Sequence, residues 1–333
     1  MALKEALFYQ VEDDQKVRCY LCPHRCRLKP EQKGICRVRV NKEGVLYSLN
    51  YGQVSSLALD PIEKKPLYHF YPGRLILSAG TFGCNLACPF CQNYSIAHLS
   101  PETKYVSPVD LLALALRCQS EGSIGVAFTY NEPTIWFEYV LDCARLLHEH
   151  GQQVALVTNG HIEAEPLDEL LPYVGAMNID VKAFNEDFYR RLCKGSLAEV
   201  KERVEQAAAR THVEITTLVI PGENDSLEEI DALASWLASI NPMIPLHLSR
   251  YHPAYQFNRP PTPEKTLLDA RKQAQEHLKF VYLGNIGGED NSTYCPECGH
   301  LLVERHYYQT SIAGLENGAC SQCGAAIPYL VTS

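Results

Sequence analysis

A short apolar segment that leads into a cysteine-bearing loop is the feature that most constrains the fold of this chain. Residues 75–77 are apolar and Gly80 and Gly83 follow them, so residues 75–78 predict a buried strand that leads into a loop. The loop carries three cysteines in the spacing C-x3-C-x2-C, at Cys84, Cys88 and Cys91. Iron–sulfur clusters are held by cysteine thiolates, which suit soft metals. We therefore expect a 4Fe-4S cluster at the carboxyl end of a strand.

The number of cysteines in this loop indicates what kind of site it is. Clusters usually take four thiolates, and this loop offers three. One iron of a 4Fe-4S cluster would then lack a protein ligand and would leave a coordination position for a substrate or cofactor. An open position is typical of catalytic metal sites. The alternatives are buried free cysteines or a zinc knuckle completed by His98, although zinc more often binds matched C-x2-C pairs.

Downstream of the loop, short apolar segments alternate with helical ones up to about residue 288. Strands are predicted at 75–78, 125–130, 154–158, 177–181, 213–220, 246–251 and 280–283. Helix starts are predicted by four pairs of residues: Ser107 with Pro108, Ser196 with Glu199, Ser226 with Glu229, and Thr262 with Pro263. Such alternation predicts a parallel sheet with right-handed crossovers. We expect an α/β fold that forms a partial or full (β/α) TIM-type barrel.

Polar or glycine-bearing segments follow these strands where each strand stops. In (β/α) barrels the working residues lie at the carboxyl ends of the strands. Any one segment alone would be ordinary turn chemistry. Because all of them follow strands downstream of the cluster loop, together they predict one site. The segments are Asn131-Glu132-Pro133, Thr158-Asn159-Gly160, Asp180 with Lys182, Pro221-Gly222-Glu223, and Arg250-Tyr251-His252.

Two further cysteine clusters flank the predicted barrel. The N-terminal cluster would close a zinc or iron–sulfur site with a structural or electron-transfer role, on Cys19, Cys22, Cys26 and Cys36. The C-terminal pairs resemble a zinc ribbon, with a redox-active iron centre as the alternative, on Cys295, Cys298, Cys320 and Cys323. We therefore expect a Cys-rich segment at 1–67, a core domain at 68–290 and a zinc-ribbon-like module at 291–333.

Composition indicates the cellular compartment of the protein and which partners to expect. Its 333 residues include 14 cysteines, and clusters account for all of them except Cys118, Cys143 and Cys193, which we expect to be small buried hydrophobes. No signal peptide or run of eighteen apolar residues is present, so we expect a cytoplasmic protein without membrane contact. In that reducing compartment, clustered cysteines indicate metal rather than disulfides. The net charge of −9 makes nucleic acid an unlikely partner.

Residues 68–288 resemble the radical S-adenosylmethionine (SAM) superfamily, and within it the pyruvate formate-lyase activating enzymes. The resemblance rests on the cysteine loop with Phe90 before its last cysteine, and on Asp180-Val181-Lys182 for the family's Asp-x-Lys. Tyr130-Asn131-Glu132-Pro133 stands where the family has Gly-Gly-Glu, so both glycines are replaced. With its flanking CxLCPHxC, CNLACPFCQN, TYNEP and NIDVK segments, the chain is similar to the radical enzyme of the AmmeMemoRadiSam group.

The resemblance implies roles for individual residues. Glu132 would bind the methionine amino group of SAM and Lys182 its carboxylate, with Asp180 near the reaction centre or a cation. His252 would contact the ribose region, and the segment that begins at Ile220 would lie on the adenine side. Asn131, Thr158 and Asn159 complete the expected cofactor site.

The resemblance also implies a reaction. One-electron reduction of the cluster would cleave SAM to methionine and a 5'-deoxyadenosyl radical, which abstracts hydrogen from a substrate. The leading hypothesis for the substrate is a glycine of a partner protein, and another macromolecular or small substrate of the AmmeMemoRadiSam system is the alternative. The electron would come from a donor such as flavodoxin or ferredoxin. No general acid or base is required, so no catalytic residue is assigned.

Two hypotheses from other classes compete with this reading. A multi-cluster electron-transfer protein would need a fourth cysteine at the central cluster and no polar strand ends. A zinc-ribbon interaction module would bind nucleic acid or an acidic protein through the segment 18–39. This segment contains seven basic residues and one acidic residue, Glu31. The acidic balance of the chain and the absence of interleaved aromatic residues count against the second hypothesis.

Overall fold

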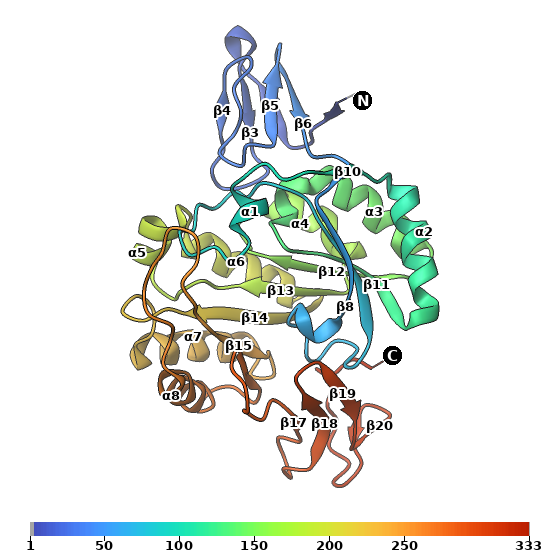
Figure 1. Cartoon of the computed structure of the whole chain (residues 1–333), viewed down its shortest axis with the longest axis vertical. Helices are drawn as coiled ribbons and strands as arrows, with labels where there is room; N and C mark the ends of the chain where they lie inside the picture. The colour runs from blue at the N-terminus through green and yellow to red at the C-terminus, as the bar shows by residue number, and fades with distance from the viewer. Residues whose placement is uncertain (1–2, 333) are drawn as a thin grey trace.

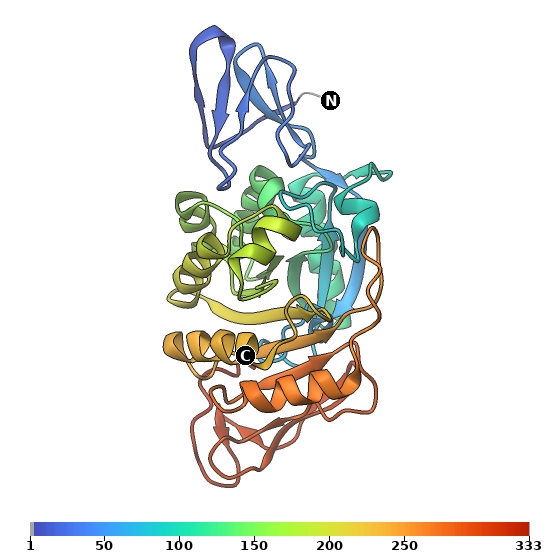
Figure 2. The same cartoon turned by 90° about the vertical axis from the view of Figure 1, so that its left-hand side faces the viewer.

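The computed structural model describes residues 3–332. Figures 1 and 2 show the N-terminal strands at one end of the long axis, a sheet covered by helices in the middle, and the C-terminal strands at the opposite end. No helix in the described range is both long and apolar enough to cross a membrane.

Two small antiparallel sheets form the N-terminal part. One has the order β1-β6-β5 and contains β1 (Lys4–Glu5), β6 (Val45–Ser48) and β5 (Arg39–Lys42). The other has the order β2-β3-β4 and contains β2 (Tyr9–Val11), β3 (Val17–Cys19) and β4 (Arg27–Leu28). A separate pair joins β7 (Gln53–Val54) to β10 (Lys104–Tyr105).

The core is an eight-stranded sheet in the order β16-β15-β14-β13-β12-β11-β9-β8. Seven strands are parallel: β9 (Leu75–Gly80), β11 (Ser123–Phe128), β12 (Gln153–Thr158), β13 (Ala176–Asp180), β14 (His212–Val219), β15 (Leu246–Arg250) and β16 (Val281–Gly284). The sequence prediction of these strands is confirmed. An antiparallel edge strand, β8 (Ser56–Pro61), was not predicted. Within residues 3–332 β8 and β16 do not pair, so the barrel is partial.

Helices follow the parallel strands and cover the outside of the sheet (Figure 1). They are α1 (Tyr94–Ala97), α2 (Pro108–Cys118), α3 (Phe137–Glu149), α4 (Ala164–Leu170), α5 (Glu186–Phe188), α6 (Leu197–Ala208), α7 (Leu227–Ile240) and α8 (Glu264–Ala274). Because helices on one side and packed side chains on the other exclude water, β11 is buried along its whole length.

Three of the four predicted helix starts have a serine N-cap. Ser107 and Asp110 form a reciprocal capping box on α2, and Ser196 and Ser226 accept hydrogen bonds at the starts of α6 and α7. The helix predicted at Thr262 and Pro263 is present, since α8 begins at Glu264, but Thr262 is not its cap. Its buried hydroxyl donates to the Val219 carbonyl (2.6 Å), so it ties the loop before α8 to the end of β14 and does not cap the helix.

The C-terminal part is built from short antiparallel strands. β18 (Leu301–His306) pairs with β17 (Thr293–Tyr294) and β19 (Gln309–Ile312), and β20 (Leu315–Glu316) pairs with β21 (Ala319–Cys320).

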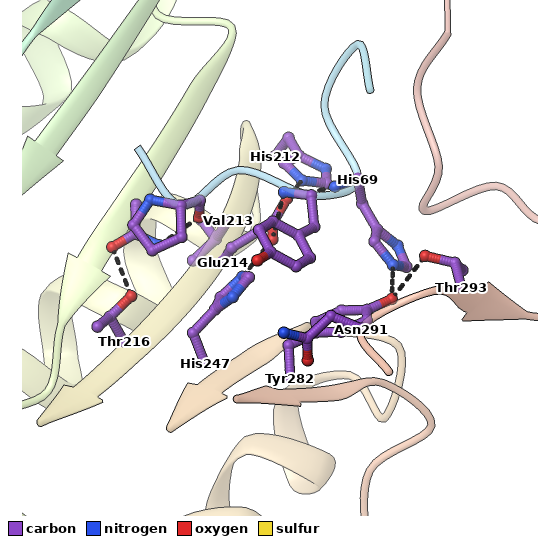
Figure 3. A network of polar contacts seen from close by, with 12 residues as sticks. His69, His212, Val213, Glu214, Thr216, His247, Tyr282, Asn291 and Thr293 are labelled. Atoms are coloured by element: carbon purple, nitrogen blue, oxygen red, sulfur yellow. Dashed lines mark hydrogen bonds and ion pairs between the residues drawn. The ribbon is translucent and has the colours of Figure 1, made fainter. Parts of the chain in front are cut away.

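A buried polar network joins this part to the barrel (Figure 3). Glu214 of β14 accepts from the backbone N–H of His69 (2.7 Å) and lies 2.6 Å from Nε2 of His247. His69 contacts the Tyr282 hydroxyl (2.7 Å), which contacts Thr293 of β17 (2.8 Å). Burial alone would raise the pKa of Glu214, but its hydrogen bonds to histidines outweigh burial and hold the pKa well below its usual range.

Candidate active site

A cavity of about 570 Å³ lies at the carboxyl ends of the parallel strands. Its volume lies within the range of small-molecule binding sites. The structure brings most of the sequence-predicted site residues to its wall: Cys84, Cys88, Cys91, Asn131, Glu132, Thr158, Asn159, Asp180 and Lys182. Residues from three separate strand ends therefore share one space with the three cysteines of the loop after β9.

The cysteine loop that leaves β9 is held by the turn after β11. Asn131 accepts a hydrogen bond from the Thr81 N–H (3.0 Å) and donates one to the Gly83 carbonyl (2.9 Å). Gly83 has φ +91°, and a Cβ added there would lie 2.8 Å from the Cys36 carbonyl oxygen. Only glycine fits that position. Asn131 thus positions the cluster loop with both ends of its amide.

Surroundings of low polarity keep the loop thiols protonated when no metal is bound. Burial raises the pKa of Cys84 well above its usual value and that of Cys91 to about 11. A hydrogen bond with Cys193, followed by burial, raises the pKa of Cys88. Cys193 is buried as expected, and it also contacts a predicted cluster ligand. Because thiolates are the form that binds iron, metal binding here releases protons.

The buried Glu132 carboxylate accepts hydrogen bonds from three donors. Its Oε1 accepts from the Thr134 N–H (2.8 Å) and from the Thr158 hydroxyl (2.7 Å). Its Oε2 accepts from the Asn159 N–H (2.8 Å). Burial raises the pKa of Glu132, while these hydrogen bonds act in the opposite direction. Because Oε2 accepts one bond from the described residues and a carboxylate oxygen can accept two, it has room for a cationic donor from the cavity.

Asn159 connects this carboxylate to the cysteine loop. Its Nδ2 donates to the Asn85 side-chain oxygen (2.9 Å) and lies 3.7 Å from the Cys84 sulfur. Asn85 in turn donates to the His161 carbonyl (2.7 Å). Amide donors near a ligating sulfur orient it and tune a bound metal. The segment that follows β12 therefore lies beside the predicted cluster.

Asp180 and Lys182 place a charge pair on the cavity wall. Lys182 Nζ lies 2.6 Å from Asp180 Oδ2, and the two side chains are 19% and 29% exposed. Burial alone would lower the pKa of Lys182, but the Asp180 carboxylate outweighs burial and raises it. Lys182 therefore carries a positive charge that can turn from Asp180 to the carboxylate of a ligand.

Two predicted cofactor residues do not line this cavity. Ile220 is buried, and its N–H donates to the Asn224 side chain (2.6 Å). The His252 side chain is exposed, while its carbonyl accepts from Gln92 Nε2 (3.0 Å) in the cysteine loop. The structure places His252 next to the loop through its backbone.

The segment around β8 adds residues that sequence reasoning missed. Lys64 and Lys65 line the cavity, and both pair with Asp60 at 2.9 and 2.7 Å. The Tyr130 hydroxyl also donates to Asp60 (2.6 Å). The only sequence signal was an acid at the end of an alternating segment followed by two lysines. Further lining residues without a sequence signal are Thr216, Ser249 and Asn285.

Comparison with known proteins identifies the family. A model of the radical SAM superfamily matches residues 79–237. An uncharacterized protein of Methanocaldococcus jannaschii is 42% identical over 339 residues, which span 99% of this chain and 100% of that protein. The chain belongs to the radical SAM superfamily. Membership implies a 4Fe-4S cluster and SAM, and the donor set fits, because three thiols, a carboxylate with spare accepting capacity and an ammonium line one cavity.

More distant relatives agree with this family. A pyruvate formate-lyase-activating enzyme of Clostridium pasteurianum is 26% identical over 176 residues, covering 51% of this radical SAM protein and 72% of its own length. Among solved structures, a radical SAM methyltransferase from Sphaerobacter thermophilus has a TM-score of 0.50 at 19% identity. It covers 70% of this chain and 71% of its own. The second similarity supports the fold alone.

The C-terminal cysteines meet in a compact group. The sulfurs of Cys295 and Cys323 are 3.7 Å apart, as are those of Cys298 and Cys320, and all four lie within 4.8 Å of one another. Four sulfurs around one tetrahedral ion at about 2.3 Å lie about 3.8 Å from each other. This group therefore has the geometry of a site for a single metal ion.

Proposed function

We propose that the cavity binds SAM beside a 4Fe-4S cluster on Cys84, Cys88 and Cys91, and that the protein is a hydrogen-abstracting radical enzyme. When bound, the cluster and SAM supply a 5'-deoxyadenosyl radical. The observation that carries the proposal is the shared cavity, in which three thiols face a carboxylate and an ammonium that suit the two ends of an amino acid.

The residues of this chain bind and orient the cofactor in this proposal. Glu132 Oε2 accepts from the SAM ammonium, because it has spare accepting capacity and is buried. Lys182 pairs with the SAM carboxylate. Asn131 and Asn159 hold the cysteine loop in place through their amides. Burial of these groups excludes water from a reactive species.

Metal content and SAM affinity test the proposal. Anaerobically purified protein with Cys84, Cys88 and Cys91 all changed to alanine should lose the iron of this site and its SAM binding. Cys118→Ala is the matched control, since Cys118 is half-buried outside every cluster. Retention of the central iron by the triple variant would refute the site.

The substrate we propose is a glycine of a partner protein. Support comes from the Asp180-Val181-Lys182 segment and from the relative named as a pyruvate formate-lyase-activating enzyme. The electron donor would be a flavodoxin or ferredoxin. A glycine-centred radical in electron paramagnetic resonance, after incubation of reduced enzyme and SAM with candidate partners, supports this choice. Efficient turnover of a free metabolite without a partner would instead favour the small-substrate alternative of the AmmeMemoRadiSam system.

We also propose zinc for the C-terminal group. The 3.7 Å sulfur separations match a tetrahedral zinc–thiolate site. Zinc has no redox chemistry, so this module would be structural. Iron in place of zinc would favour the redox-centre alternative.

A further inference from the structure

The four N-terminal cysteines line one cavity, separate from the active-site cavity. Cys19 ends β3, Cys22 and Cys26 lie in the loop to β4, and Cys36 precedes β5. All are buried except Cys26, which is half-buried. At Gly34, an added Cβ would lie 3.7 Å from the sulfurs of both Cys26 and Cys36. The four cysteines therefore surround one protected space, and their thiols are suited to hold a soft metal or an iron–sulfur cluster there.

The spacing of these sulfurs differs from that of the C-terminal group. Within residues 3–332, the C-terminal cysteines are the only three or more His, Cys, Asp or Glu side chains whose ligand atoms all lie within 4.8 Å of one another. The N-terminal sulfurs surround one cavity, but no three of them lie within 4.8 Å of one another. The same is true of the sulfurs of Cys84, Cys88 and Cys91. One tetrahedral ion needs sulfurs about 3.8 Å apart. A 4Fe-4S cluster binds each thiolate on a different iron, so its thiolates lie farther apart.

A buried arginine on the cavity wall suits an anionic group. Arg39 lines the cavity, donates to the Leu7 carbonyl (2.9 Å) and pairs with Glu138. Its buried Nε–H has no hydrogen-bond partner among the described residues. Buried N–H groups are normally paired. A metal-bound thiolate or a cluster sulfide in the cavity would accept this hydrogen bond.

The walls of the two cysteine cavities are in contact. Gly83, the residue before Cys84, packs against the Cys36 carbonyl so closely that a Cβ there would lie at 2.8 Å. His24, which lines the N-terminal cavity, lies with its Nε2 2.7 Å from the carbonyl of Asn85, the residue after Cys84. Backbone on both sides of one active-site cysteine is therefore touched by the wall of the second cavity.

We propose that Cys19, Cys22, Cys26 and Cys36 hold a second iron–sulfur cluster, which passes single electrons to the cluster at Cys84, Cys88 and Cys91. The relay rests on the proposed function, whereas the metal assignment does not. An external one-electron carrier, a flavin or iron–sulfur protein, reduces the second cluster by one electron. The second cluster then returns to its oxidised state as the active-site cluster is reduced. No bond forms or breaks in this transfer.

Metal analysis of the Cys84→Ala, Cys88→Ala, Cys91→Ala protein tests the assignment without touching the N-terminal cavity. Expected are about four iron and four sulfide per chain, the content of one 4Fe-4S cluster, with a Mössbauer spectrum of that cluster type. Adding Cys22→Ser and Cys36→Ser should remove this iron. Absence of iron from the first variant, or a second equivalent of zinc in its place, would overturn the assignment.

The relay is tested by comparing two reductants in Cys22→Ser, Cys36→Ser protein that keeps the active-site cysteines. With reduced flavodoxin as donor, formation of 5'-deoxyadenosine should fall at least tenfold, and with dithionite it should stay at the wild-type rate. An equal fall with both reductants, or no fall with either, overturns the relay. If wild-type protein forms no 5'-deoxyadenosine with dithionite while the first variant keeps its iron, the proposed function fails and the second cluster stands.

Discussion

Glu132→Gln is the substitution whose effects follow most directly from the geometry of the site. The carboxylate accepts three hydrogen bonds, from the Thr134 N–H, the Thr158 hydroxyl and the Asn159 N–H. A glutamine amide keeps one oxygen and replaces the other with a donor. If its oxygen stays at the Oε1 position, its NH2 group faces the Asn159 N–H. The substitution therefore removes one acceptor and the negative charge while it conserves shape.

The substitution should lower both the free energy of unfolding and the affinity for SAM. A hydrogen bond to a charged group contributes about 1.5–3 kcal/mol, and an unsatisfied buried donor costs about 1–3 kcal/mol. The amide is easier to bury than the carboxylate, which offsets part of this loss, so we expect unfolding free energy to fall by about 2–4 kcal/mol. Loss of the charge-assisted bond to the SAM ammonium should weaken binding by about 10- to 100-fold.

The assay combines denaturant unfolding with SAM titration of the folded, iron-loaded protein. Glu63→Gln is the matched control, because Glu63 is also buried and accepts a backbone N–H, from Gly73 (2.7 Å), but does not line the cavity. The control should lose stability without losing SAM affinity. Unchanged SAM affinity in folded Glu132→Gln protein with normal iron content would refute the assigned role of Glu132.

Three further predictions follow from other parts of the structure. Lys182→Ala should weaken SAM binding about 10-fold or more with iron unchanged, and unchanged affinity in titration would exclude it from the site. Cys298→Ser should lower zinc, measured by plasma emission, from about one equivalent while active-site iron stays; loss of both metals would contradict separate sites. Burial lowers the pKa of His69 from 6.5 to about 3, so the unfolded chain binds this proton more tightly. The contribution of His69 to the unfolding free energy should be full above pH 6.5 and decline toward pH 3 by up to about 1.4 kcal/mol per pH unit. Glu214 adds a loss only as the pH falls below its usual pKa of 4.5. The same change of unfolding free energy with pH in wild type and His69→Asn, measured by urea unfolding at several pH values, would contradict this.

The parallel strands and the cysteine loop could be predicted because their signals are local. Each strand is a short apolar segment between turn residues, and the three cysteines lie within eight positions. The convergence of Glu132, Thr158 and Asp180 followed from the rule that carboxyl ends of parallel strands meet at one edge. The contacts that side chains make at this edge could not be predicted from local sequence. Asn131, for example, positions the cysteine loop by hydrogen bonds to residues some fifty positions away in sequence.

Tertiary contacts overrode local signals elsewhere. Thr262 before Pro263 has the sequence of a helix start, but burial gives its hydroxyl a better partner in β14. β8 has alternating residues that suit an edge strand, yet nothing in its sequence shows that Asp60 would gather two lysines and a tyrosine at the cavity. The contact of His24 with Asn85 spans 61 positions and joins two cysteine clusters that appear independent in sequence.

Reductive cleavage of SAM tests the central claim most directly. Anaerobic, iron-loaded protein with SAM and dithionite should form methionine and 5'-deoxyadenosine in equal amounts, quantified by chromatography. The Cys84→Ala, Cys88→Ala, Cys91→Ala protein should form neither, and Cys118→Ala protein should match the wild type. Absence of 5'-deoxyadenosine from wild-type protein with an intact cluster and bound SAM, or its formation by the triple variant, would contradict the account.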